Sequence, residues 1–225
     1  MLQSLFKWGV CELKYSTAIF DLDGTIADSK KGIIKAFELG LEHFGIKEND
    51  REKLNLVVGP PLIYSYKTYY NMSDNDAQKA VEIFRSYYRT EGILLTEIYD
   101  GMAKTLDTLY KNKIRLAVAT AKPEPFALSI LERFDLKKYF ELIVAASFDC
   151  SFNEKDQILE YTLDKLNSKE NTIMIGDRDT DMKAAKKCGI DSAYAMYGCG
   201  SEEEAKECAP TYLFNSPEEL IGIIL

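Results

Sequence analysis

The 225-residue sequence predicts an α/β fold in which helices cover both faces of a parallel sheet, with a second, all-helical unit inserted after the first strand. Two observations predict this fold. Short apolar runs alternate with segments of helical period over most of the chain, as is typical of parallel sheets. The alternation is broken once, at residues 30–96, where helical patterns follow one another without a convincing strand.

Six apolar runs are the expected strands, and turn residues followed by a helical pattern come after each of them. The runs span residues 17–20, 114–120, 142–146, 172–176, 192–196 and 211–214. The helical segments that accompany them span residues 102–112, 124–134, 155–167, 180–188, 202–208 and 217–224. We therefore expect a Rossmann-like core made of residues 1–29 and 97–225. Ligands bind such sheets at the carboxyl ends of the strands.

The composition excludes several functional classes. A net charge of −8 and a pI of about 4.9 argue against nucleic-acid binding, which depends on a basic surface. We expect a cytoplasmic protein, because the sequence has neither a signal-peptide pattern nor an apolar run of the ~18 residues that span a membrane. The five cysteines form no CxxC pair, so they predict free thiols rather than disulfides or a zinc site.

The residues that are absent narrow the chemistry further. His43 is the only histidine, which excludes a histidine-rich metal site and argues against a Ser-His-Asp hydrolase. No segment matches the P-loop pattern GxxxxGK[ST]. Catalysis that depends on histidine clusters or on a P-loop is therefore not expected.

Polar residues suited to one reaction follow four of the expected strands. They are Asp21, Asp23, Thr120, Lys122, Lys155, Asp177 and Asp181. Several carboxylates at one edge of a sheet repel one another strongly unless a cation joins them. A site with a few carboxylates, and with room for water and a phosphate group, suits Mg²⁺. Together with two lysines and a hydroxyl, this set is suited to phosphoryl transfer.

The motifs that carry these residues resemble those of the haloacid dehalogenase-like superfamily, in the same order. They are "DLDGT" at 21–25, "TAKP" at 120–123, a lysine before a helix at 155, and "GDRDTD" at 176–181. The insertion at 30–96 resembles that superfamily's helical C1 cap domain. The segments "GPPL", "YDG" and "IGDRDTDMKAAKKCGI" are similar to the phosphoglycolate phosphatase-like group, some members of which are called 5′-nucleotidases.

The resemblance implies a role for each motif residue. Asp21 is the expected nucleophile, which takes the phosphoryl group, and Asp23 the expected general acid and base. The expected metal ligands are Asp21, the backbone carbonyl of Asp23, and Asp177, with Asp181 orienting them or binding through water. The residues expected to bind phosphate are Gly24, Thr120, Ala121, Lys122 and Lys155. Asp179 is expected to cap the following helix, and Arg178 to pair with carboxylates or to reach the cap.

An aspartate at position 23 favours phosphate esters as substrates, because relatives that dehalogenate lack it. The sequence therefore predicts a Mg²⁺-dependent phosphatase of a small phosphorylated metabolite, similar to phosphoglycolate phosphatase. A 5′-nucleotidase, a sugar-phosphate mutase similar to β-phosphoglucomutase, and a non-catalytic phospho-ligand binding protein are the alternatives. The oligomeric state is not predicted.

Candidate substrate contacts on the cap are Tyr64, Tyr66, Tyr69, Tyr70, Tyr87 and Tyr88, with Lys67, Arg85 and Arg89.

Overall fold

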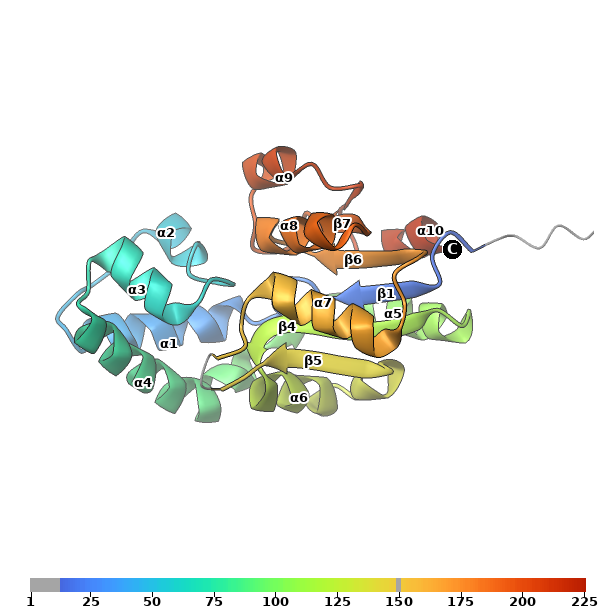
Figure 1. Cartoon of the computed structure of the whole chain (residues 1–225). Helices are drawn as coiled ribbons and strands as arrows, with labels where there is room; N and C mark the ends of the chain where they lie inside the picture. Colours follow the sequence, from blue (N-terminus) through green and yellow to red (C-terminus); the bar gives the residue numbers. More distant parts are fainter. Residues whose placement is uncertain (1–12, 149–150) are drawn as a thin grey trace, which may run out of the picture.

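Six strands form one parallel sheet in the computed structural model, which describes residues 13–148 and 151–225 (Figure 1). The strand order is β5-β4-β1-β6-β7-β8. The strands are β1 (Thr17–Phe20), β4 (Arg115–Pro123), β5 (Leu142–Ala146), β6 (Thr172–Gly176), β7 (Asp191–Ala195) and β8 (Tyr212–Phe214). This architecture confirms the predicted α/β fold.

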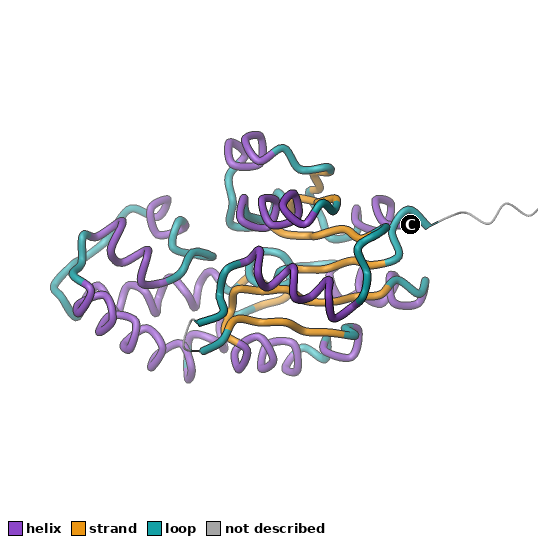
Figure 2. Tube along the Cα trace, in the orientation of Figure 1, coloured by secondary structure: helices purple, strands orange, loops and turns teal. Residues whose placement is uncertain are grey.

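Helices cover both faces of the sheet because alternate strand residues point to opposite sides (Figure 2). In β1, Ala18 and Phe20 belong to one buried cluster, whereas Ile19 belongs to another. The first cluster includes α5 (Met102–Lys111), α6 (Glu124–Arg133) and α10 (Glu219–Ile224). The second includes α7 (Lys155–Leu166) and α8 (Asp179–Cys188). A short helix, α9 (Glu202–Cys208), packs against α8.

The segment between β1 and β4 is mostly helical. It contains α1 (Lys30–Glu42), α2 (Arg51–Asn55), α3 (Leu62–Tyr70) and α4 (Asp74–Thr90). The rings of Phe37 and Tyr66 stack 4.0 Å apart inside this bundle, and the Tyr66 hydroxyl donates to the Phe37 carbonyl oxygen. We refer to α1–α4 as the cap. It faces the carboxyl ends of the strands, since the arrows of β1, β5 and β6 point toward it in Figure 1.

Two very short strands join the cap to the sheet. β2 (Ala27–Asp28) and β3 (Glu97–Ile98) pair in antiparallel fashion, so the outgoing and returning chains lie side by side. Neither strand was predictable from the sequence, because two residues are too few to show a strand period. Division of the chain at 29/30 and 96/97 stays a prediction. Short 3₁₀ turns at Gly92–Leu95 and Lys137–Tyr139 complete the described elements.

No helix in the described ranges is both long and apolar enough to cross a membrane. Two of the five cysteines, Cys11 and Cys150, lie outside the described residues. Of the remaining cysteines, Cys188, Cys199 and Cys208 are free thiols.

Candidate active site

Three buried carboxylates meet where β1 and β6 end. Asp21 follows β1, Asp177 follows β6, and Asp181 lies in the first turn of α8. One oxygen from each lies within 4.8 Å of the other two, so together they could hold a metal ion. Burial, and then the charges of Asp181 and Asp21, raise the pKa of Asp177 to about 8. The cluster therefore fits a hard cation such as Mg²⁺, which offsets this repulsion and prefers oxygen ligands.

Glycines give the carboxylates the space that they occupy. A Cβ at Gly24, which has a φ of +82°, would lie 2.0 Å from an Oδ atom of Asp177. A Cβ at Gly176 would lie 2.3 Å from the Asp181 carboxyl carbon. Any side chain at these positions would displace a carboxylate. The motif glycines are thus explained by close approach, and at Gly24 also by the left-handed backbone.

Lys155 brings a positive charge to the same cluster from the first residue of α7. Its ammonium donates to the Ala119 carbonyl oxygen at 2.9 Å and lies 2.8 Å from one oxygen each of Asp21 and Asp181. Those two oxygens receive no hydrogen bond of good geometry from the described residues. Burial alone would lower the pKa of Lys155, but the two carboxylates raise it above its usual value. The Asp21 and Asp181 oxygens therefore keep acceptor capacity, beside the charged lysine, that suits a metal cation.

Asp23 contacts a different lysine from Asp21. The Lys122 ammonium lies 2.9 and 2.8 Å from the two Asp23 carboxylate oxygens, and the Ser29 hydroxyl donates to one of them at 2.5 Å. Lys122 also donates to the hydroxyl of Tyr88, a residue of α4, at 2.8 Å. Burial opposes the charge on Lys122, but Asp23 and Tyr88 raise its pKa above the usual value. A cap residue therefore helps to position the partner of Asp23.

The end of β4 lines the cavity and carries Lys122, one of the two lysines. Thr120 is 1% exposed, and its hydroxyl accepts a hydrogen bond from the Lys122 amide at 3.2 Å. The pairing with β5 changes register between Thr120 and Pro123. This strand runs three residues beyond the predicted end at 120. Thr120, Ala121 and Lys122 all line the same cavity as Asp21 and Asp23.

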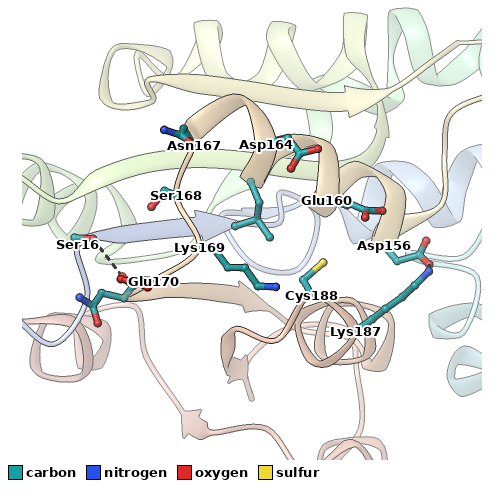
Figure 3. Close-up of a pocket in the computed structure, with 12 residues that line it drawn as sticks. Ser16, Asp156, Glu160, Asp164, Asn167, Ser168, Lys169, Glu170, Lys187 and Cys188 are labelled. Carbon is teal, nitrogen blue, oxygen red and sulfur yellow. Dashed lines mark hydrogen bonds and ion pairs between the residues drawn. The ribbon is translucent and has the colours of Figure 1, made fainter.

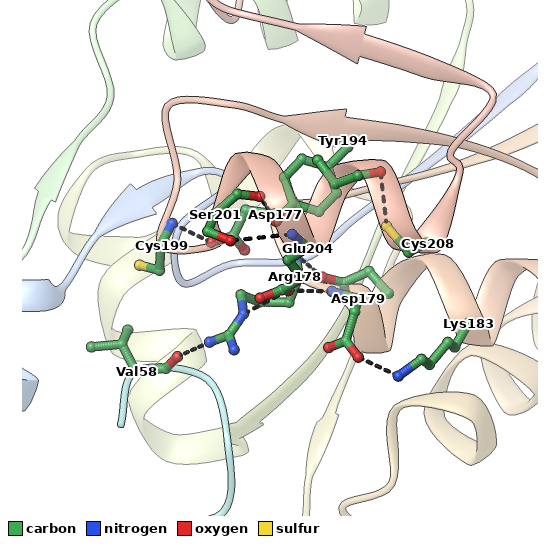
Figure 4. A network of polar contacts seen from close by, with 12 residues as sticks. Val58, Asp177, Arg178, Asp179, Lys183, Tyr194, Cys199, Ser201, Glu204 and Cys208 are labelled. Carbon is green, nitrogen blue, oxygen red and sulfur yellow. Dashed lines mark hydrogen bonds and ion pairs between the residues drawn. The ribbon is translucent and has the colours of Figure 1, made fainter. Parts of the chain in front are cut away.

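Arg178 joins the carboxylate cluster to the cap, as Figure 4 shows. Its guanidinium pairs with Glu204 of α9 at 3.0 Å and donates to the carbonyl oxygen of Val58, in the segment that follows α2, at 2.5 Å. Arg178 thus pairs with a carboxylate and reaches the cap at the same time. The neighbouring Asp177 accepts a hydrogen bond from the amide of Cys199 at 2.7 Å.

The prediction that Asp179 caps the following helix is wrong. Arg178 occupies the N-cap position, and the Asp181 carboxylate accepts its backbone N–H at 3.2 Å. Asp179 is the first residue of the helix, and its carboxylate pairs with Lys183 instead. The reason is spacing, because Asp181 lies at the third helical position, from which its carboxylate reaches back to the N-cap N–H.

The cavity in front of the carboxylates has a volume of about 280 Å³ and extends between core and cap. Of the six candidate cap tyrosines, Tyr88 lines it, and of the three candidate cations, Arg85 does. Tyr66 is instead buried in the cap, and Lys67 pairs with Asp74 at the surface. The sequence could not distinguish these residues, since tyrosines occur on several sides of α3 and α4.

A larger groove lies elsewhere, with a volume of about 740 Å³. It borders α7 and α8, and residues such as Asp156, Ser168, Lys187 and Cys188 line it (Figure 3). Lys187 pairs with Asp156 across it. None of the three clustered carboxylates reaches this groove, so the chemistry is assigned to the smaller cavity.

Comparisons with known proteins find similar sequences and similar structures. Residues 18–195 match the family model described as haloacid dehalogenase-like hydrolase. A 5′-nucleotidase of Pseudomonas aeruginosa is 32% identical over 89% of this chain and 91% of its own length. A phosphoglycolate phosphatase of Aquifex aeolicus is 29% identical over 92% of this chain and 95% of its own. The structure of a predicted phosphatase from Clostridium acetobutylicum superposes with a TM-score of 0.89 at 39% identity, covering 93% of this chain and 98% of that one.

Proposed function

Because the chain belongs to the haloacid dehalogenase-like hydrolase family and is a phosphoric monoester hydrolase, we propose that it cleaves small phosphorylated metabolites through an aspartyl-phosphate on Asp21. The observation that carries this proposal is the meeting of Asp21, Asp177 and Asp181 beside the Lys155 ammonium. A nucleophile, a cation site and a fixed positive charge are thereby brought to one point at the end of the sheet.

Asp21, Asp177 and Asp181 are the residues that would hold Mg²⁺ in this proposal. When bound, Mg²⁺ would offset the negative charge that the carboxylates and the phosphate group bring together. Lys155, which contacts both Asp21 and Asp181, would offset the rest of this negative charge. Thr120 lines the cavity with its buried hydroxyl and would hydrogen-bond a phosphate oxygen.

Two displacements at phosphorus make up the proposed reaction. In the first, an Asp21 oxygen forms a bond to phosphorus, the ester P–O bond breaks, and protonated Asp23 gives its proton to the leaving oxygen. In the second, Asp23 takes a proton from water, whose oxygen attacks phosphorus and releases Asp21 and inorganic phosphate. Lys122 and Ser29 hold the Asp23 carboxylate in position for both steps.

A panel of phosphate monoesters in Mg²⁺ buffer tests this proposal. We expect release of inorganic phosphate that stops on addition of a chelator and is lost in Asp21→Asn. Activity that survives both changes would contradict the mechanism. Isomerised sugar phosphate with little free phosphate would instead indicate a mutase. Ligand binding without turnover of any ester would indicate a non-catalytic phospho-ligand binding protein.

A further inference from the structure

Much of the apolar lining of the active-site cavity comes from the cap. Its side chains come from α1, from the segment after α2, from α3 and α4, and from α6 of the core, and they are Ile33, Val57, Leu62, Val81, Phe84 and Phe126. We call these six residues the apolar wall. Asp21 lines the same cavity, so a substrate whose phosphate contacts Asp21 places its leaving group beside this wall.

Each basic side chain in the described lining already has partners within the protein. Lys155 contacts Asp21 and Asp181, and Lys122 contacts Asp23 and Tyr88. Arg178 pairs with Glu204 and donates to the Val58 carbonyl oxygen.

Arg85 is engaged at the rim. It donates to the Phe148 carbonyl oxygen at 3.1 Å, and its guanidinium carbon lies 4.5 Å from the centre of the Phe148 ring. A carboxylate on the leaving group could pair with Arg85 only at this rim, and deeper in the cavity it would lie beside the apolar wall without a charge partner. Burying an unpaired charge is strongly unfavourable.

The size of the cavity adds a second restriction. Its volume of about 280 Å³ lies just below the range of ~300–1,000 Å³ that is common for small-molecule sites. This space must hold the phosphate group as well as the leaving group. A single ring or a short aliphatic chain suits it better than a whole nucleoside.

We propose that the leaving group of the substrate is compact, uncharged and apolar, so that the apolar wall selects against carboxylate-bearing esters such as phosphoglycolate. This inference rests on the phosphatase function proposed above and specifies its substrate class. Its physical basis is first the burial of apolar surface on binding. In addition, every cation in the described lining already contacts other groups of the protein, so burying a further charge beside the apolar wall is unfavourable.

Benzyl phosphate, phosphoglycolate and 5′-AMP test the inference in a direct comparison. All three are esters of primary alcohols, so differences in rate report mainly on the leaving-group pocket. We expect kcat/KM for benzyl phosphate to exceed that for each of the other two by about tenfold or more, as apolar pockets typically discriminate. Equal or faster cleavage of phosphoglycolate or of 5′-AMP would overturn the inference.

Binding to the Asp21→Asn variant separates this inference from the proposed mechanism. If wild-type protein cleaves none of the esters, the proposed function fails, but calorimetry with the same compounds still tests the pocket. We expect benzyl phosphate to bind about tenfold more tightly than phosphoglycolate. Equal affinities, or tighter binding of phosphoglycolate, would overturn the inference whatever the turnover.

A matched pair of lysine substitutions tests the apolar wall itself. Leu62→Lys places a cation in the wall at a half-buried position, whereas Leu56→Lys makes the same change at an exposed position of the cap, where Leu56 is 46% exposed. We expect Leu62→Lys to reduce the preference for benzyl phosphate over phosphoglycolate by about tenfold. We expect Leu56→Lys to keep it. An unchanged preference in a folded Leu62→Lys protein, verified by circular dichroism, would overturn the role of the wall.

Discussion

The Tyr88 hydroxyl oxygen, on the cap, lies 2.8 Å from the Lys122 ammonium, in the core. The same ammonium contacts both carboxylate oxygens of Asp23. One buried lysine, Lys122, thereby links the position of the cap to the position of Asp23, the proposed proton-transfer group. Closure of a cap that completes an active site is a common way to exclude water and align groups.

Tyr88→Phe removes this link and keeps the ring. We expect kcat/KM for the best ester to fall about fivefold, because a hydrogen bond of this kind contributes ~1 kcal/mol. Tyr87→Phe is the control, since the neighbouring tyrosine does not line the cavity. Steady-state kinetics measure both. Equal activity of the two variants would show that Tyr88 contributes packing alone.

Lys155→Met leaves the carboxylate cluster without its buried cation. We expect the free energy of unfolding in the absence of metal to fall by about 3 kcal/mol, as when one partner of a buried ion pair is removed. Urea denaturation measures it. Lys165→Met, on the exposed side of the same helix, serves as the control and is expected to change stability by less than ~0.5 kcal/mol. Equal stability of the two variants would contradict the proposed charge balance.

Mg²⁺ is expected to stabilise the folded protein, since only the folded state brings the three carboxylates together. Thermal unfolding in magnesium chloride and in chelator measures the shift in Tm. The shift should vanish in Asp177→Asn, while that variant in chelator keeps at least wild-type stability, because ionised Asp177 is penalised by burial and repulsion. Asp179→Asn, at the first residue of α8 and paired with Lys183, should keep the shift. A full shift in Asp177→Asn would refute the metal assignment.

Arg178→Met is expected to loosen the contact between the core and the cap segment that contains Val58. The guanidinium holds the Val58 carbonyl oxygen, so its loss should speed backbone hydrogen exchange in residues 56–59 by about tenfold, equivalent to ~1.4 kcal/mol. Lys183→Met, on the exposed side of α8, should leave this exchange unchanged. Unchanged exchange in both variants would mean that contacts other than that of Arg178 hold the segment around Val58 in place.

Residues next to strand ends were predictable from the sequence. Asp21, Thr120 and Asp177 each follow an apolar run, and parallel strands bring their carboxyl ends to one edge of the sheet. The period of the strands therefore predicts both the fold and the neighbourhood of these side chains, without knowledge of any contact between them.

The particular cap groups that core residues contact were not predictable in the same way. Tyr88 and Val58 reach Lys122 and Arg178 only through docking of the cap, which no local period encodes. The failed prediction for Asp179 has a local origin, because the helix begins at Asp179 and the carboxylate of Asp181, at the third helical position, reaches the N-cap N–H instead. Sequence patterns thus indicate which residues are polar and near a strand end, whereas packing selects their partners.

Acid quenching during turnover tests the central claim most directly. Protein mixed with excess ester in Mg²⁺ buffer and quenched in acid is digested, and its peptides are examined by mass spectrometry. We predict a phosphoryl group on Asp21 and none in Asp21→Asn, because the proposed reaction passes through an aspartyl-phosphate on that residue. Rapid turnover with no phosphoryl group on Asp21, and with activity retained in Asp21→Asn, would contradict the account.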